Sequence, residues 1–280
     1  MTILVTGGKG KTSSELSALL EARKLSYLVA SRSPSKDGPS QHVRFDWLDH
    51  STYDLPFDAS ADPITAVYLV APEVIDSFTP MKAFIDHARR KGVKRFVLLS
   101  ATVIPKGGPA YGKVHEYLET IGVEYGVVRP SWFMGMSSFS CRQVRFREGF
   151  VCSATQDGKV PFVAASDIAA VAFHLLTDET PHDTEYFIRG PELLSYEEVA
   201  QIISEAIGKP MKHERLSFEE LKTKFISFGM PQDFATVLAG FDEQIAKGSE
   251  AELDDAVLKV TGRPPKSFRE FALENRDNWI

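Results

Sequence analysis

Short apolar runs alternate with helical patterns along the first two thirds of the chain. Each run has four to six residues, is rich in β-branched side chains and is bounded by polar or turn residues, as buried parallel strands are. The predicted strands are Ile3–Thr6, Tyr27–Ser31, Val43–Asp46, Ala66–Val70, Arg95–Ser100 and Glu124–Arg129. Apolar spacings of three and four predict helices over Ser13–Arg23, Met81–Lys91 and Tyr111–Ile121. This alternation predicts an α/β protein with a doubly wound parallel sheet.

The pattern changes after Pro130, where aromatic residues and methionines follow one another without a clean period. The run Ser195-Tyr196-Glu197-Glu198 predicts a capping box, and the helix that it opens is expected to end near Ile207, before Gly208. The other predicted elements are strands at Val160–Val163 and Glu185–Ile188 and a helix at Asp167–Leu176. The remainder predicts a smaller α-rich lobe.

A glycine-rich turn joins the first predicted strand to the first predicted helix. Its sequence is Thr6-Gly7-Gly8-Lys9-Gly10-Lys11-Thr12-Ser13. Glycines permit a tight turn and the close approach of a pyrophosphate, and the helix N-terminus presents N–H groups to the anion. The spacing Gly7-x-x-Gly10-x-x-Ser13 ends on a small serine in place of a third glycine. The turn predicts a Rossmann-like domain; a glycine turn without a ligand is the alternative.

This placement of the turn suggests how the chain is divided. We expect residues 1–130 to form the dinucleotide-binding Rossmann domain, with 160–190 packing onto it. Residues 131–159 and 191–280 are expected to form the substrate-binding lobe.

The end of the second predicted strand indicates which dinucleotide binds. An NAD enzyme usually places an acid there, whereas this chain has Ser31-Arg32-Ser33 with Lys36 nearby. A guanidinium and hydroxyls suit a 2′-phosphate, so NADP(H) is expected; a solvated basic loop is the alternative. Strand carboxyl ends are where ligands bind in such sheets. The expected cofactor contacts are Gly7, Gly8, Lys9, Gly10, Lys11, Thr12, Ser31, Arg32, Ser33, Asp46, Trp47, Ala71, Pro72, Ser100, Ala101 and Lys113.

Composition excludes several other classes. The 38 acidic and 32 basic residues leave a formal charge of −6, which disfavours a nucleic-acid binder. No apolar stretch approaches the ~18 residues that a membrane span needs, and no signal peptide is recognisable, so we expect a cytoplasmic protein. Cys141 and Cys152 show no metal or redox spacing, and no metal site is expected.

Several runs resemble a known family. Thr6-Gly7-Gly8-Lys9-Gly10, Val127-Val128-Arg129-Pro130 and Ile188-Arg189-Gly190-Pro191-Glu192 resemble the NmrA-like, atypical branch of the short-chain dehydrogenases. Ala66-Val67-Tyr68-Leu69-Val70-Ala71-Pro72 is similar to the fungal festuclavine and agroclavine dehydrogenases of ergot-alkaloid biosynthesis. The resemblance implies an NADPH-dependent reductase that delivers hydride to a cyclic iminium derived from chanoclavine-I aldehyde. The implied product is a tetracyclic clavine, with a pathway flavoenzyme acting upstream.

One departure from the short-chain dehydrogenase pattern bears on this chemistry. Ketone-reducing members use a Tyr-x-x-x-Lys pair to protonate the developing alkoxide, but His115 stands four residues after Tyr111. An iminium becomes a neutral amine on gaining hydride, so it needs no general acid. Tyr111 and Lys113 remain the candidate catalytic residues; Lys113 is expected either to hold the nicotinamide ribose or to be a solvated lysine.

A flat, cationic, indole-containing substrate suits aromatic faces and one carboxylate. The residues expected to contact it are Tyr68, Glu73, Trp132, Phe133 and Met134, with Phe139, Phe225, Phe228 and Met230 as further candidates. Ordinary core packing is the alternative for each aromatic residue. Two other functions stay open: an NADP-binding redox sensor without turnover, and a quinone or enone reductase of the same branch.

Overall fold

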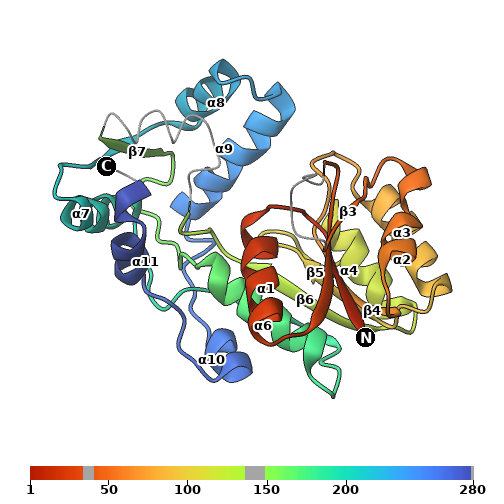
Figure 1. The fold of residues 1–280 in the computed structure, drawn as a ribbon. Helices are drawn as coiled ribbons and strands as arrows, with labels where there is room; N and C mark the ends of the chain where they lie inside the picture. The colour runs from red at the N-terminus through yellow and green to blue at the C-terminus, as the bar shows by residue number, and fades with distance from the viewer. Residues whose placement is uncertain (34–40, 136–148, 279–280) are drawn as a thin grey trace. The chain divides into compact units, whose positions relative to one another are not determined.

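The computed structural model describes residues 1–33, 41–135 and 149–278 (Figure 1). The chain divides into two compact units. Unit 1 comprises Met1–Pro130, Ala165–Ile188 and Lys259–Gly262, and unit 2 comprises Ser131–Ala164, Arg189–Leu258 and Arg263–Ile280.

Unit 1 is built on a parallel sheet with the strand order β3-β2-β1-β4-β5-β6-β8 among the described residues. The strands are β1 (Thr2–Val5), β2 (Ser26–Ser31), β3 (His42–Arg44), β4 (Ile64–Leu69), β5 (Arg95–Leu99), β6 (Glu124–Pro130) and β8 (Thr184–Ile188). Every neighbouring pair is parallel. From β1 the chain first adds β2 and β3 on one side, and then adds β4, β5, β6 and β8 on the other side. The predicted doubly wound, Rossmann-like α/β fold is confirmed.

Helices cover both faces of this sheet (Figure 1). On one face, α1 (Lys11–Ala22) packs against α6 (Ala165–Thr177), and α6 contacts β4, β5 and β6. On the other lie α3 (Phe78–Arg90) and α4 (Tyr111–Thr120). Their apolar faces, Phe84 and Ile85 on α3 and Leu118 on α4, are fully buried in the core with Leu98 of β5. Strands buried on both faces explain the nearly continuous apolar runs.

Two short elements of unit 1 carry no clear periodicity and lie outside the sequence predictions. They are a 3₁₀ turn, η1 (His50–Thr52), and α2 (Leu55–Ala59). Asp49 caps the 3₁₀ turn by accepting a hydrogen bond from the Ser51 amide. Both elements are too short for an amphipathic pattern to emerge.

Unit 2 is mainly helical. Its elements are α7 (Tyr196–Ile207), α8 (Phe218–Ser227), α9 (Gln232–Ala246), α11 (Phe268–Glu274), the 3₁₀ turn η3 (Arg276–Asn278), and a parallel pair of strands, β7 (Phe150–Ser153) and β9 (Lys212–Arg215); α10 (Ala256–Thr261) crosses the unit boundary. The predicted capping box is present, because Ser195 and Glu198 satisfy each other's backbone amides at the start of α7. The helix α7 ends at Ile207 as predicted, and Gly208 follows it in the left-handed conformation.

One predicted strand of unit 2 is wrong. Val160–Val163 forms only isolated bridges, Val160 with Leu194 and Val163 with Phe133. Its apolar residues are buried as an irregular segment, which apolar periodicity alone does not distinguish from a strand. Within the described residues, no helix combines the length and apolarity needed to cross a bilayer.

Candidate functional site

The turn between β1 and α1 is shaped so that two glycines are required. Gly7 and Gly8 have φ angles of +87° and +54°, which L side chains rarely adopt. A Cβ on Gly7 would lie 2.9 Å from the Cβ of Val70, and one on Gly8 would lie 2.8 Å from the Cβ of Ser31. Glycine at both positions therefore lets the turn pack closely against the ends of β4 and β2, as the tight glycine turn of a dinucleotide-binding fold does.

Two buried hydroxyls fix the turn to its surroundings. The Thr6 hydroxyl donates to the Tyr68 carbonyl at 2.9 Å and accepts from the Val70 amide at 2.8 Å. The Ser13 hydroxyl donates to the Thr6 carbonyl at 2.8 Å. These bonds join the carboxyl ends of β1 and β4 to the first turn of α1. Thr6 is not among the predicted cofactor contacts, although a polar residue at the end of an apolar strand is a signal that could have identified it.

The N-terminus of α1 carries no side-chain cap. Its N-cap residue is Gly10, and no acidic residue lies in the first turn. No carboxylate of this first turn therefore neutralises the positive end of the helix dipole. The bare glycine turn and this helix end together fit the pyrophosphate of a dinucleotide.

Basic residues lie at the end of β2 and at the turn. Arg32 and Ser33 follow Ser31, the last residue of β2, and both are exposed, as are Lys9 and Lys11. No carboxylate occupies the described end of β2. Lys36, the further basic candidate, lies outside the described residues.

The segment after β3 gives a mixed result. Asp46 lies at a tight turn, where its Oδ1 accepts a hydrogen bond from the Leu48 amide at 3.0 Å. The Trp47 side chain is buried in an aromatic cluster, 4.9 Å from the Phe45 ring centroid and 5.4 Å from that of Phe84. Trp47 therefore has a core role in this structure, and only Asp46 offers a side chain to a ligand.

The loops after β4 and β5 lie at the same edge of the sheet as the glycine turn. Ala71, Pro72 and Ala101 are half-buried there. Ser100 is 6% exposed, and its hydroxyl has no hydrogen-bonding partner among the described residues. The Ser100 hydroxyl is one of several such buried groups in the described structure, and its position at the end of β5 leaves it free to bond a ligand or a water. Ser100 is a predicted cofactor contact.

The two candidate catalytic residues each have an acidic neighbour. Tyr111 is half-buried at the start of α4; burial and, less strongly, the charge of Glu73 raise the pKa of its hydroxyl. Lys113 is exposed, and its charge contributes to the lowered pKa of Asp76, which is held mainly by hydrogen bonds from Thr79. Unit 1 thus brings the predicted residues Tyr111 and Glu73 into one electrostatic environment.

His115, four residues after Tyr111, faces the interior. It is buried, and its Nδ1 lies 3.9 Å from Oε2 of Glu185 on β8. Burial lowers the pKa of the imidazole, against a weaker opposing effect of the Glu185 charge. A neutral, buried imidazole takes the position that a lysine holds in the usual pair, so α4 offers no cation there.

Two of the predicted substrate contacts are buried. Tyr68 is 0% exposed on β4; its hydroxyl lies beside Thr12 without a hydrogen bond of standard geometry, and burial raises its pKa. Met134 is buried in the unit 2 core. Neither side chain presents a surface to a ligand, so the structure does not support them as substrate contacts.

The remaining candidates keep accessible surface. Glu73 is exposed in unit 1, and Trp132 and Phe133 are half-buried in unit 2. The Trp132 ring packs edge-on against Phe241 of α9, with ring centroids 6.2 Å apart. Phe139 and Cys141 lie outside the described residues, and Cys152 is buried.

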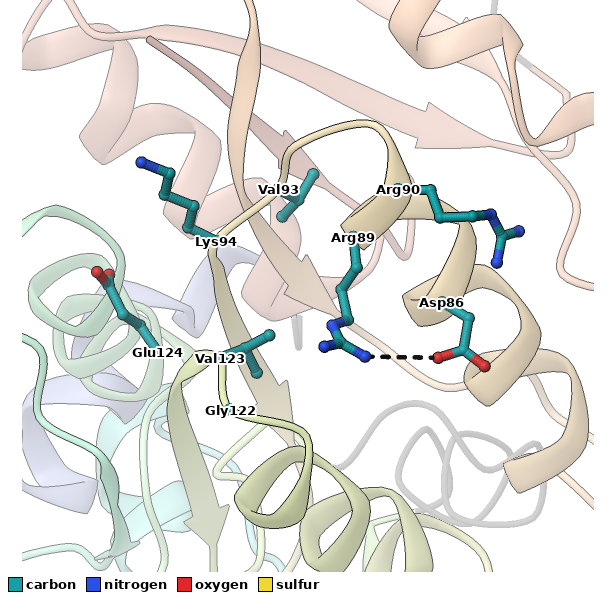
Figure 2. A pocket seen from close by; sticks show the side chains of 8 residues that line it. All are labelled: Asp86, Arg89, Arg90, Val93, Lys94, Gly122, Val123 and Glu124. Carbon is teal, nitrogen blue, oxygen red and sulfur yellow. Dashed lines mark ion pairs between the residues drawn. The ribbon is translucent and has the colours of Figure 1, made fainter.

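A separate cavity of about 580 Å³ lies at the opposite edge of the unit 1 sheet, where β5 and β6 begin. Figure 2 shows Arg89 directed toward Asp86, at 4.0 Å, while Arg90 and Lys94 point away from each other. Glu124, which also lines it, is paired with Arg95 at 2.7 Å. These charges do not converge on one point, and none of the predicted cofactor contacts lines this cavity. Among the described residues, no cluster of His, Cys, Asp or Glu is placed to hold a metal ion.

The strand order and the covering helices define a protein with a Rossmann-like α/β fold. The model of the NmrA-like family matches residues 59–272. Over its full length the chain is 45% identical to festuclavine synthase I of Penicillium roqueforti, with 100% of both chains covered. It is 42% identical to agroclavine dehydrogenase of Claviceps fusiformis, covering 99% of that protein. The chain belongs to the NmrA-like family.

Solved structures agree on the fold. The Citrobacter sp. triphenylmethane reductase complexed with NADP(H) superposes with a TM-score of 0.78 at 21% identity, covering 99% of this chain and 100% of that one. At this identity the likeness extends to the fold alone.

Proposed function

We propose that this protein is an NADPH-dependent reductase that delivers hydride to the C=N carbon of a cyclic iminium derived from chanoclavine-I aldehyde, giving a tetracyclic clavine. The observation that carries the proposal is full-length similarity to proteins named festuclavine synthase and agroclavine dehydrogenase, in a chain that keeps a bare glycine turn at Gly7 and Gly8. When bound, NADPH supplies the hydride.

The cofactor would be held by backbone more than by side chains. The amides of the turn at Gly7 and Gly8 and the N-terminus of α1 would bind the pyrophosphate. Arg32, with Ser31 and Ser33, would bind the 2′-phosphate, because a guanidinium pairs well with a phosphate dianion. The unpartnered Ser100 hydroxyl would accept or donate a hydrogen bond on the nicotinamide side.

The residues at the start of α4 fit a substrate that needs no proton. The raised pKa of Tyr111 keeps its hydroxyl protonated at neutral pH, and His115 is buried and turned toward Glu185. Reduction of an iminium converts a cation to a neutral amine without creating an oxyanion. Tyr111 would therefore orient the substrate and need not protonate it.

Substrate recognition would combine charge and aromatic surface. Glu73 would attract the iminium cation, and Trp132 and Phe133 would contact the flat ring system. Lys113 would bind the nicotinamide ribose hydroxyls. With these roles the protein would act mainly by orienting the substrate against the cofactor. Holding the hydride donor and acceptor in contact lowers the activation barrier by several kcal/mol.

The test is loss of NADPH absorbance on mixing enzyme with a preformed cyclic iminium, beside a simple quinone and an enone. We expect saturable turnover with the iminium, and Tyr111→Phe should keep its rate within about tenfold, since no general acid is lost. Saturable NADPH binding without oxidation by any substrate would point instead to a redox sensor. Turnover with the quinone or enone alone would also refute the proposal.

A further inference from the structure

An arginine is buried in a strand of unit 1. Arg129 lies near the end of β6, its side chain is 8% exposed, and charged residues are rarely so buried unless paired. Its NH1 donates to Oε2 of Glu185 at 2.6 Å, and its guanidinium lies 4.4 Å from the Phe187 ring centroid. Both partners are on β8.

The other hydrogen bonds of Arg129 go to the loop that follows β5. Its Nε donates to the Ala101 carbonyl at 3.2 Å, and its NH2 donates to the Thr102 carbonyl at 2.8 Å. The loop amides are also bonded to β6: Ser100 donates to Val128 at 2.8 Å and Thr102 donates to Pro130 at 3.0 Å. The guanidinium therefore holds two consecutive carbonyls directly after Ser100.

The far end of this loop is also constrained. Ala110, the residue before α4, has φ +52° and ψ −115°, a conformation that L residues avoid. A Cβ on Gly112 would lie 2.4 Å from the Pro105 carbonyl oxygen. The loop from Ser100 to Tyr111 is thus held at its beginning by Arg129 and at its end by backbone packing.

We propose that Arg129 is a positioning residue for the reduction: it fixes the Ser100–Thr102 backbone so that the Ser100 hydroxyl is presented to the nicotinamide side of the cofactor. The inference rests on the proposed function for its kinetic consequence. Arginine suits this task, because its planar fork reaches two carbonyls and a carboxylate at once, whereas a lysine ammonium is a point charge. Arg129→Lys keeps the charge and loses the fork.

The chain contains a matched control. Arg95 on β5 is likewise nearly buried, with a side chain 11% exposed, and its Nε pairs with Glu124 at 2.7 Å. Its NH1 donates to the carbonyls of Leu176 and Asp178 at 3.3 and 2.6 Å. This guanidinium performs the same kind of clamping at the opposite edge of the same sheet, away from Ser100.

The experiment compares Arg129→Lys with Arg95→Lys in the whole protein. Hydrogen exchange of the free protein should rise in the peptide containing Ser100–Thr102 only in Arg129→Lys, and near Leu176–Asp178 only in Arg95→Lys. In single turnover with NADPH and the iminium, Arg129→Lys should slow hydride transfer about tenfold or more, because small misplacements of reacting groups are costly. Its Kd for NADPH should stay within about threefold, since the phosphate contacts are unchanged. Arg95→Lys should keep both values.

Equal slowing by both variants would show a merely structural role for Arg129 and overturn the inference. Wild-type hydride transfer in Arg129→Lys would overturn it as well. If the wild-type protein binds NADPH but reduces no iminium, the proposed function fails, while the exchange of Ser100–Thr102 and the fluorescence of bound NADPH still test the positioning role. Unchanged exchange and unchanged fluorescence in Arg129→Lys would then refute it.

Discussion

Glycines with positive φ angles occur both at the edge of the unit 1 sheet where the strands begin and at the edge where they end, but their surroundings differ. At the edge where β5 and β6 begin, Gly92 and Gly122 have φ angles of +96° and +68°, and a Cβ on either would meet nothing within 4 Å. At the edge where the strands end, Gly7 and Gly8 also have positive φ angles, but a Cβ there would collide with Val70 or Ser31. Gly92 and Gly122 follow helices, whereas Gly7 and Gly8 let the turn pack closely against the ends of β4 and β2.

Unpartnered hydroxyls and positive φ angles do not separate the two edges. The Ser100 hydroxyl, where β5 ends, is buried without a partner among the described residues, and so is the Thr65 hydroxyl, where β4 begins. Ala110 has a positive φ before α4, and Lys24 and Asp183 have positive φ angles just before β2 and β8 begin. The comparison between the edges therefore rests on the packing around the glycines.

The largest difference between the two edges is expected when one glycine at each edge is replaced by alanine. Gly7→Ala should weaken NADPH binding at least about 100-fold, because the shifted turn loses charge-assisted hydrogen bonds to phosphate. Gly122→Ala should cost only about 1 kcal/mol of folding free energy, since the strained φ is its one penalty. Calorimetric titration with NADPH and urea unfolding measure the two effects. Wild-type affinity in Gly7→Ala would remove the distinction between the edges.

A charge substitution tests which cofactor binds at the edge where the strands end. Arg32→Gln should raise the Kd for NADPH about 10- to 100-fold, because one charged hydrogen-bonding partner of the 2′-phosphate is lost. The Kd for NADH should hardly change. Arg90→Gln, an equally exposed arginine at the edge where the strands begin, is the control and should alter neither value. Equal weakening of NADPH and NADH by Arg32→Gln would contradict the assignment of Arg32.

A smaller effect is expected from Glu73→Gln. The carboxylate is exposed and its field is screened, so the KM for the iminium should rise only about twofold to fivefold. Because the Glu73 charge raises the pKa of Tyr111, its removal should lower that pKa, which NMR titration of labelled tyrosine measures. The raised pKa places the Tyr111 ionisation above pH 10, so kcat/KM should show no Tyr111 step between about pH 7 and 9. Asp62→Asn, just before β4 begins, is the control; an equal change in KM would show a general charge effect.

The smallest expected effect is a gain in stability. Ala110→Gly should stabilise the fold by about 1 kcal/mol, because glycine adopts the φ of +52° without the strain that alanine bears. The urea midpoint measures it, and the opposite sign is expected for Gly122→Ala. A loss of stability in Ala110→Gly would mean that the conformation at residue 110 is not strained.

Apolar patterning was sufficient for the sheet of unit 1, because strands buried on both faces must be apolar throughout. The same reasoning missed β7 and β9. The sequence of β9, Lys212-His213-Glu214-Arg215, is polar, and its pairing with β7 depends on neighbours that are distant along the chain. The prediction that Val160–Val163 is a strand failed for the converse reason, since burial alone makes a segment apolar.

The candidate site was predictable where backbone chemistry restricts the residue type. Gly7 and Gly8 stand out because no other residue fits their conformation and space. Aromatic residues carry no such mark, so Tyr68 and Trp47 suit a ligand wall as well as the core that they occupy. The role proposed for Arg129 depends on hydrogen bonds to carbonyls 27 and 28 positions away in sequence, which no local pattern indicates.

The discontinuity of unit 1 limits how the protein can be dissected. The strand β8 and the helix α6 come from Ala165–Ile188, after the chain has passed through part of unit 2. A fragment ending at Pro130 would lack β8, the hydrogen-bonding partner of β6, and α6, the neighbour of α1. The unpaired edge of β6 would promote aggregation. An isolated unit 1 would have to be made by joining residue 130 to residue 165 with a linker.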